Sequence, residues 1–178
     1  GDGAYGRRLP LMASYLASLE ADVIALQEVL IAPALGHDTA LFLASELGMS
    51  ASTLSLRRKV REVDGRSADS WSGLAVLSRN AATLSRPIPL PADPRDGERA
   101  ALAVEIGDAA VVCLHLTHLQ DAGELRARQL AAVFEAMAER PDALIAGDFN
   151  APAETLSLAQ SGFADCRLFL GRPSASTV

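Results

Sequence analysis

The chain has 178 residues, a formal net charge of −6 at pH 7 and 49% hydrophobic residues. This length is typical of one domain, and the apolar content is sufficient for a sizeable core, which excludes a fibrous or disordered class. The acidic charge gives no overall attraction for nucleic acid, so any binding of a polyanion must be local. No apolar run is long enough to span a bilayer, so we expect no transmembrane segment. No leader opens the chain, which favours the cytoplasm. We also expect a monomer.

The first part of the chain predicts two helices that flank a buried strand. Apolar residues recur at three- and four-residue spacing over 9–19, which is typical of a helix with one buried face. The continuous apolar run 23–26 indicates a strand covered on both sides, and this strand ends in the polar pair Gln27-Glu28. Residues 38–47 predict a second helix, which ends before a glycine.

The middle of the chain predicts further strands. Residues 52–69 carry five basic side chains and indicate two short strands, or one strand and an ordered loop. A solvated, charged edge is the simpler interpretation of this basic segment. Buried strands are expected over 73–78, 101–106 and 110–117, and the Gly107-Asp108 pair between the last two predicts a hairpin turn.

The last predicted helix carries polar residues on its apolar face. Asp121 begins a capping-box pattern, which predicts a helix over 121–140. Arg126 and Gln129 lie in the stripe of this helix that should be buried, and such a break in the pattern indicates a functional or structural demand. An apolar strand is expected after the helix, over 143–146.

Two of the predicted strands end in polar side chains that carry oxygen atoms. Gln27-Glu28 follow the first strand, and Asp148 and Asn150 follow the last one. Proteins of the α/β class place ligands at strand ends, where a side chain reaches solvent from a rigid backbone. Carboxylate and amide oxygens suit a hard cation such as Mg²⁺, which keeps several of its waters. Each motif alone would also fit a solvated loop, but together they are candidates for a metal and phosphate site.

The strand expected over 111–119 contains two histidines. Side chains alternate between the two faces of an extended strand, so His115 and His118 should lie on opposite faces. We therefore expect His118 to face the cleft and contact a phosphoryl oxygen, and His115 to lie away from the cleft in the core. No residue spacing indicates a zinc site, a phosphate-binding glycine loop or a nucleophile elbow.

Five segments in this order resemble the endonuclease/exonuclease/phosphatase superfamily, to which pancreatic deoxyribonuclease and bacterial sphingomyelinase belong. They are Asp22–Val29, Ser72–Arg79, Thr117-His118-Leu119, Arg126-x-x-Gln129 and Gly147–Asn150. The resemblance implies a four-layer α/β sandwich, in which two mixed β-sheets pack face to face with helices outside. One such domain is expected over 1–178, because no linker or repeat divides the chain.

The resemblance also implies roles for individual residues. Glu28 matches a glutamate that binds Mg²⁺, for which Mn²⁺ is an alternative ion. His118 matches a histidine that contacts the phosphate. Asp148 and Asn150 match the aspartate and asparagine that orient the attacking water and hold the scissile phosphate.

Three more residues match the family's pattern, and two of the family's segments have no match in this chain. Arg126 and Gln129 match a helix pair that either is structural or supports the site residues, and Arg99 matches an arginine to which no role is assigned. The family's opening strand with a metal-binding asparagine and its closing Ser-Asp-His segment have no match, so we expect a domain that is truncated N- and C-terminally. Such a chain is expected to fold marginally and to be nearly inactive, unlike a version extended at both ends.

The function implied by this resemblance is Mg²⁺-dependent hydrolysis of a phosphoester by in-line attack of water, without a covalent intermediate. The acidic charge and the aromatic content of 4% favour a small phosphodiester, phosphomonoester, phospholipid head group or nucleotide as substrate. A Mg²⁺-dependent nuclease that acts on DNA or RNA is the alternative. A catalytically inactive binding protein on the same fold is a second alternative, which the joint presence of the four site residues disfavours.

Overall fold

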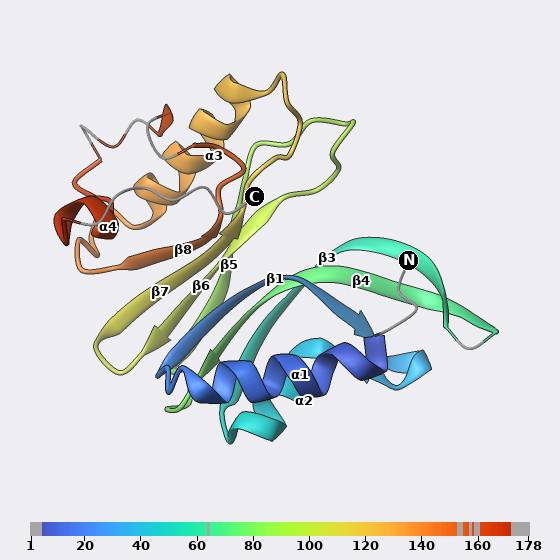
Figure 1. The fold of residues 1–178 in the computed structure, drawn as a ribbon. Coiled ribbons are helices and arrows are strands. Elements are labelled where there is room, and N and C mark those ends of the chain that lie inside the picture. Colours follow the sequence, from blue (N-terminus) through green and yellow to red (C-terminus); the bar gives the residue numbers. More distant parts are fainter. Residues whose placement is uncertain (1–4, 64, 153–154, 157, 159–160, 172–178) are drawn as a thin grey trace.

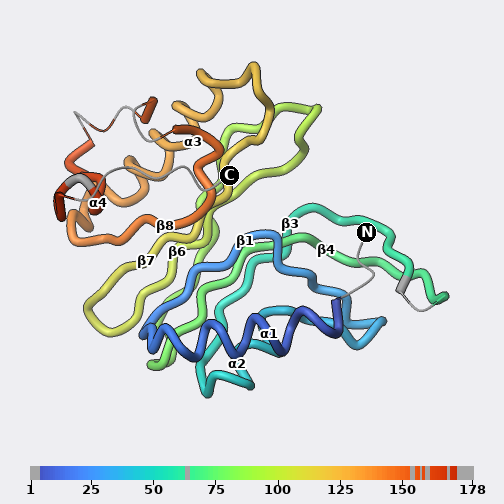
Figure 2. Tube along the Cα trace, in the orientation of Figure 1, coloured from blue at the N-terminus to red at the C-terminus, as the bar shows by residue number. Residues whose placement is uncertain are grey.

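Two β-sheets packed face to face form the centre of the molecule, and helices cover their outer faces (Figure 1). The computed structural model describes residues 5–63, 65–152, 155–156, 158 and 161–171. Strands from the first half of the chain build one sheet and strands from the second half build the other, as the colours in Figure 2 show. This arrangement confirms the four-layer α/β sandwich that the sequence predicts.

Sheet A has the strand order β2-β1-β4-β3, and all of its neighbouring strands are antiparallel. Its strands are β1 (Val23–Ala32), β2 (His37–Asp38), β3 (Ser50–Val63) and β4 (Arg66–Ser78). Its outer face is covered by α1 (Tyr5–Ser18) and α2 (Thr39–Leu47), and the short 3-10 helix η1 (Pro33–Leu35) joins β1 to β2. Ala13, Leu43 and Leu77 are part of the apolar cluster between these helices and the sheet.

Sheet B has the strand order β5-β6-β7-β8 and is a mixed sheet, because β7 and β8 are parallel whereas the other pairs are antiparallel. The expectation of two mixed sheets is therefore wrong for sheet A, whose described strands are all antiparallel. Its strands are β5 (Leu84–Pro89), β6 (Ala100–Ile106), β7 (Ala109–His115) and β8 (Leu144–Asp148). The connection between the parallel strands contains α3 (Gly123–Ala136), which packs on the sheet through Leu130 and Val133. The short helix α4 (Cys166–Phe169) follows β8. No helix in the described residues is long and apolar enough to cross a membrane.

The contact between the two sheets is a small apolar core that ends at Gly73 of β4. The core is formed by Leu74, Val76, Leu102, Val104, Val111 and Cys113, all of which are buried. Next to Gly73, both neighbouring strands shift register, β1 between Gln27 and Val29 and β3 between Ser55 and Arg57. Such bulges insert one residue and bend the strand. Beyond them, the face of β4 that carries Leu74 continues with Ser72, so the apolar core gives way to a polar surface.

The double bulge depends on the absence of a side chain at Gly73. A Cβ atom built at this position would overlap the backbone carbonyl oxygen of Leu54 in β3. Backbone atoms cannot move aside as the end of a flexible side chain can. Glycine is therefore required for the close approach of β3 to β4, which places the bulge of β3 level with that of β1 on the other side of β4.

Several predicted boundaries need correction. The strand expected to end at Gln27-Glu28 continues to Ala32, and the segment expected as short strands is part of the long hairpin of β3 and β4. Asp121 does not cap α3, which starts at Gly123 without a side-chain cap; instead, Asp121 forms an ion pair of 3.1 Å with Arg95. A local capping pattern is only one of the interactions open to a carboxylate, and here the nearby arginine binds it.

We predict that Gly73→Ala lowers the free energy of unfolding by about 2 to 3 kcal/mol, because the added methyl group displaces the backbone of β3. Gly123→Ala is the matched control, since nothing lies within 4 Å of a Cβ at that first residue of α3. The control should be as stable as the wild type or slightly more stable. Urea unfolding followed by circular dichroism measures both variants. Equal stability of the two would show that β3 can move away without loss.

Candidate active site

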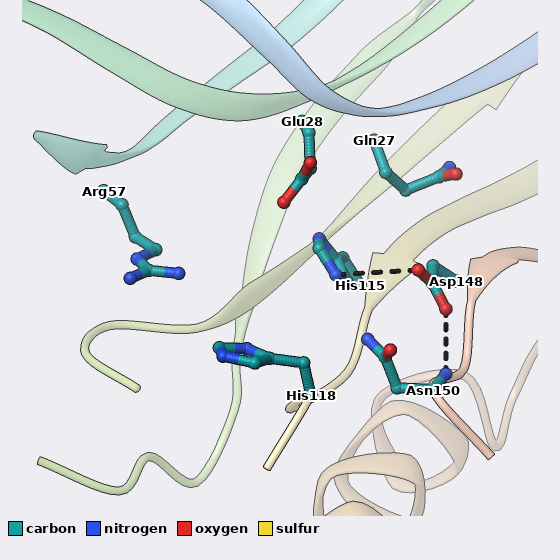
Figure 3. Close-up of a pocket in the computed structure, with 7 residues that line it drawn as sticks. All are labelled: Gln27, Glu28, Arg57, His115, His118, Asp148 and Asn150. Carbon is teal, nitrogen blue, oxygen red and sulfur yellow. Dashed lines mark hydrogen bonds and ion pairs between the residues drawn. The ribbon is translucent and has the colours of Figure 1, made fainter. Parts of the chain in front are cut away.

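A pocket of about 500 Å³ opens at the rim of the two sheets, where the inter-sheet core ends (Figure 3). It is lined by Gln27, Glu28, Arg57, His115, His118, Asp148 and Asn150. All four candidate residues from the sequence, Glu28, His118, Asp148 and Asn150, are therefore brought together. They come from three separate parts of the chain: Glu28 lies in sheet A, and the other three residues lie at or just after the ends of strands of sheet B.

Glu28 enters the pocket because of the bulge in β1. Its backbone has a φ of 55°, in the left-handed region, and the register of β1 shifts at this residue. Residues other than glycine rarely adopt this conformation, and they are often found at functional sites. In Figure 3 the side chain of Glu28 points from β1 into the pocket, toward His115. The bulge thus directs an exposed carboxylate into the pocket instead of leaving it in regular strand alternation.

Asp148 and Asn150 are held by hydrogen bonds at the end of β8. Oδ1 of Asp148 accepts a hydrogen bond of 2.9 Å from the backbone N–H of Asn150, which has a left-handed φ of 48°. The Asn150 Nδ2 donates a hydrogen bond of 3.0 Å to the carbonyl oxygen of Leu116. Half of the Asp148 side chain is exposed, so its carboxylate can meet a water or substrate while its orientation is set.

Gly147 allows this turn to form directly after the strand. Its φ of 143° lies in a region that side chains avoid, and a Cβ there would overlap the backbone of Leu114 in β7. The glycine of the Gly-Asp-Phe-Asn segment therefore lets β8 approach β7 closely. As a result, Asp148 lies opposite His115 in the register of the parallel pair.

The expectation that His115 lies away from the cleft is wrong. Both His115 and His118 line the pocket, and Nε2 of His115 is 3.8 Å from Oδ2 of Asp148. The alternation argument required an extended strand through both histidines, but β7 ends at His115 and residues 116–119 have no regular structure. Burial, followed by the charge of Arg99, lowers the pKa of His115, so its imidazole is neutral at pH 7.

His118 is held by a buried ion pair that sequence reasoning missed. Asp96 is 1% exposed, and its Oδ1 is 3.1 Å from Nδ1 of His118. Arg99 donates two hydrogen bonds to the same carboxylate, from Nη2 to Oδ1 at 2.6 Å and from Nε to Oδ2 at 2.9 Å. Arg99, to which the sequence assigned no role, thus holds Asp96 against the imidazole. The only sequence signal was the spacing of Asp96 and Arg99, three residues apart in a loop rich in proline.

Nδ1 of His118 is held by the ion pair of Asp96 and Arg99. Burial opposes ionisation of Asp96, but hydrogen bonds from Arg99 and Thr117 and the charges of Arg99 and His118 lower its pKa to about 2. The carboxylate is therefore ionised at pH 7, and Nδ1 of His118 lies 3.1 Å both from Oδ1 of Asp96 and from Nη2 of Arg99. This leaves Nε2 of His118 for contacts in the pocket.

The segment that carries His118 is fixed by the polar residues of α3. Gln129 is fully buried, and its Oε1 accepts a hydrogen bond of 2.9 Å from the backbone N–H of Thr117. The Arg126 Nη1 donates hydrogen bonds to the carbonyl oxygens of Thr117 and Leu119, at 3.3 and 2.6 Å. These contacts explain the two polar residues on the buried face of the helix and give them a structural role.

Two further residues line the pocket: Gln27, which belongs to the polar strand end noted in the sequence, and Arg57, which the sequence did not identify as a site residue. Gln27 donates a hydrogen bond of 3.2 Å from Nε2 to Sγ of Cys113 and so joins the two sheets at the edge of the core. Arg57 follows the bulge of β3, is 36% exposed and lies with its Nη1 3.8 Å from Oδ1 of Asp96. In Figure 3 its guanidinium points into the pocket from the side opposite Asp148. Neither the bulge nor this direction is visible in the local sequence.

The oxygen donors of the pocket suit a hydrated cation better than a closed metal cage. Among the described residues, no group of three or more His, Cys, Asp and Glu side chains is arranged to hold an ion alone. Mg²⁺ is commonly bound through only one or two carboxylates and keeps several waters. Glu28, with Asp148 across the pocket, offers this kind of donor set.

We predict that Asp96→Asn lowers the free energy of unfolding at pH 7 by about 3 kcal/mol, because it leaves the buried Arg99 without its counter-charge. The pKa of Asp96 is lowered from 3.8 to about 2 in the folded state, so its stabilisation is complete above about pH 4 and is lost as the pH falls toward 2. The difference between variant and wild type should therefore be smaller at pH 3 than at pH 7. Urea unfolding at both values measures it.

Asp22→Asn is the control for this prediction. Asp22 is 90% exposed and forms one surface ion pair with Arg79, so its replacement should change stability little at either pH. A loss as small for Asp96→Asn as for Asp22→Asn would contradict the structural importance of the buried pair.

Comparisons with known proteins agree with the architecture of the sheets. The model of the Endonuclease/Exonuclease/phosphatase family matches residues 6–168. The structure of an endonuclease/exonuclease/phosphatase from Beutenbergia cavernae DSM 12333 is similar, with 25% identity and a TM-score of 0.63, over 86% of this chain and 45% of the other. A comparison with curated proteins gives no match.

Two further structures share the fold. ANGEL2, a 2′,3′-cyclic phosphatase in complex with adenosine-2′,3′-vanadate, is 19% identical with a TM-score of 0.59, over 81% of this chain and 44% of that one. D. rerio TDP2 in complex with a single strand DNA product is 22% identical with a TM-score of 0.58, over 89% of this chain and 59% of that one. The chain thus spans less than two thirds of the length of each of these structures. Because the family model covers residues 6–168, this protein belongs to the endonuclease/exonuclease/phosphatase family, whose members are phosphoester hydrolases.

Proposed function

We propose that this protein hydrolyses a phosphoester bond with water and a divalent cation. The observation that carries the proposal is the convergence of Glu28, His118, Asp148 and Asn150 in one open pocket. Enzymes of this family generally use divalent metal ions. We propose Mg²⁺ as the ion, with Mn²⁺ as an alternative, and Glu28 as its main protein ligand. When bound, Mg²⁺ supplies positive charge that stabilises the phosphoryl oxygens.

The residues of the pocket support distinct roles in an in-line attack. Asp148 has a carboxylate that is oriented by Asn150 and half exposed, which suits a group that positions the attacking water and accepts its proton. Nε2 of His118, whose Nδ1 is bound to Asp96, is available to a phosphoryl oxygen. Together with the amide of Asn150, it would stabilise the charge that develops in the transition state. No side chain of the pocket needs to form a covalent bond to phosphorus in this scheme.

Two substrate classes remain in the proposal. The acidic composition favours a small phosphodiester or phosphomonoester, a phospholipid head group or a nucleotide. The structurally similar ANGEL2 is a 2′,3′-cyclic phosphatase, and the structure of TDP2 contains a single strand DNA product. A nuclease activity is therefore the second candidate, and the cationic residues of β3 favour it. We also propose that the protein acts as a monomer in the cytoplasm.

We predict Mg²⁺-dependent hydrolysis of bis-p-nitrophenyl phosphate that EDTA abolishes, measured on the product of the complete open reading frame. Asp148→Asn should lower kcat/KM at least about 100-fold, because it removes the proton acceptor for the attacking water. Asp142→Asn, which changes an exposed carboxylate paired with Arg140 just before β8, should keep kcat/KM within about twofold of the wild type. Hydrolysis that resists EDTA, or an equal effect of both variants, would refute the mechanism.

The assignment of Glu28 to the metal gives a separate prediction. Glu28→Gln should weaken Mg²⁺ binding at least about tenfold in isothermal titration calorimetry, because an amide replaces the carboxylate at the bulge. Glu20→Gln and Glu46→Gln change exposed carboxylates outside the pocket and should leave the affinity unchanged. Similar losses in all three variants would mean that Glu28 is not a ligand.

A further inference from the structure

Gln27 lies on the face of β1 that packs against sheet B. It is opposite Leu74 in the register of β1 and β4, and residues directly opposite each other in an antiparallel pair share a face. Leu74 belongs to the buried core between the sheets. The bulge that follows brings Glu28 to the same side, so two consecutive side chains of β1 line one pocket. Regular alternation would have turned one of them away.

The amide nitrogen of Gln27 is held by the thiol of Cys113. Nε2 donates a hydrogen bond of 3.2 Å to Sγ, and the same Sγ donates one of 3.4 Å to the carbonyl oxygen of Leu26. Burial raises the pKa of the Cys113 thiol, so the thiol keeps its proton at pH 7 and uses it in the hydrogen bond to Leu26. A thiol has a single proton, so toward Gln27 it can only accept. The amide must therefore turn an N–H group, and not its oxygen, toward Cys113.

The amide oxygen of Gln27 is left for the pocket. Oε1 accepts no hydrogen bond from any residue that the structure describes, and it is not sealed from solvent. An amide oxygen accepts hydrogen bonds but does not take up a proton at pH 7. The pocket thus contains an acceptor of fixed direction that is neither charged nor basic.

The strand spacing puts Gln27 and Asp148 within reach of one water molecule. Cys113 and His115 are alternate residues on one face of β7, and Asp148 lies opposite His115. Alternate residues of a strand are about 6.8 Å apart, which separates the amide over Cys113 from the row of His115 and Asp148. A water that donates to two acceptors at about 2.8 Å each spans about 5 Å, and the side chains cover the rest. In Figure 3 Gln27 and Asp148 lie on the same side of the pocket, across from Arg57.

We propose that Gln27 is a catalytic residue that orients the attacking water together with Asp148. This inference rests on the proposed function and adds a residue to its site. A water that donates one hydrogen to Asp148 and the other to Oε1 of Gln27 cannot rotate freely, which leaves a lone pair directed at phosphorus. As the water attacks, one proton passes to Asp148, and the other stays on the oxygen that bonds to phosphorus. The bond to the leaving oxygen breaks, and this oxygen keeps the electron pair and is protonated by solvent.

The test compares orthovanadate with orthophosphate as ligands in the presence of Mg²⁺, by isothermal titration calorimetry on the product of the complete open reading frame. Orthovanadate takes a fifth oxygen ligand and then resembles the transition state, whereas orthophosphate stays tetrahedral. Gln27→Leu should weaken orthovanadate binding about tenfold and orthophosphate binding less than about twofold, because only the five-coordinate species contains the oxygen that Gln27 holds. Its kcat for bis-p-nitrophenyl phosphate should fall about tenfold, with KM unchanged.

Gln120→Leu is the matched control, because Gln120 is exposed and lies outside the pocket lining. It should keep both affinities and kcat. Cys113 is a positioning residue in this proposal, since it acts only through the amide of Gln27. Cys113→Ala should lower orthovanadate affinity about threefold, and Cys113→Ser should restore it, because a hydroxyl can accept from Gln27 and donate to Leu26. Equal losses in the two Cys113 variants would overturn the role of the thiol.

Three results would overturn the role of Gln27. Equal losses of orthovanadate and orthophosphate in Gln27→Leu would mean that Gln27 binds the ground state. A loss of Mg²⁺ affinity in Gln27→Leu as large as that in Glu28→Gln would favour a metal ligand instead. The absence of measurable orthovanadate binding to the wild type would remove the five-coordinate state that Gln27 is proposed to hold.

This binding assay needs no turnover, so the two proposals can fail separately. A selective loss of orthovanadate in Gln27→Leu, in a protein that hydrolyses no phosphoester with Mg²⁺, would support the contact of Gln27 and refute the proposed function. Hydrolysis of bis-p-nitrophenyl phosphate, with equal orthovanadate affinity in the wild type and Gln27→Leu, would support the proposed function and refute the role of Gln27.

Discussion

The close packing of three strands around Gly73 is the constraint on which the rest of the site depends. At this residue β1 and β3 each gain an extra residue relative to β4, and a side chain on β4 would collide with the backbone of β3. On one side of Gly73 the sheets bury an apolar core. On the other side Glu28 and Arg57 turn into an open pocket. The position of the pocket thus follows from where sheet-to-sheet contact stops, which is a property of backbone packing.

The opposite wall of the pocket depends on buried polar groups. β7 ends at His115, and the irregular segment after it would have no fixed conformation without side-chain partners for its backbone. Gln129 and the buried ion pair of Asp96 and Arg99 supply these partners and orient His118. Burying these groups is unfavourable unless all of them are paired, so the network is stable only as a whole.

The net charge of the chain and the local charge of β3 have opposite signs. The net charge of −6 disfavours a polyanionic ligand, yet the strand alternation of β3 gathers Arg57, Lys59 and Arg61 on one face. Carboxylates such as Asp69 are held on the other face by the same alternation. A charge average over the chain hides this separation, because it treats residues on both faces of a strand alike. The field at the pocket is set by the few charges within a screening length, about 8 Å at physiological salt.

The amino-acid sequence by itself indicated most of the helices and strands, because apolar periodicity is local. Its resemblance to the family implied the four-layer class and the roles expected of Glu28, His118, Asp148 and Asn150. The sequence failed where the outcome depends on contacts between distant segments. The place of His115 in the pocket follows from the point at which β7 ends, and the buried partners of His118 come from another loop. The direction of Glu28 follows from a bulge that only the neighbouring strand defines. Tertiary structure decided these features, because the register between strands and the pairing of buried charges are set by packing across the sheets and not by neighbouring residues in the chain.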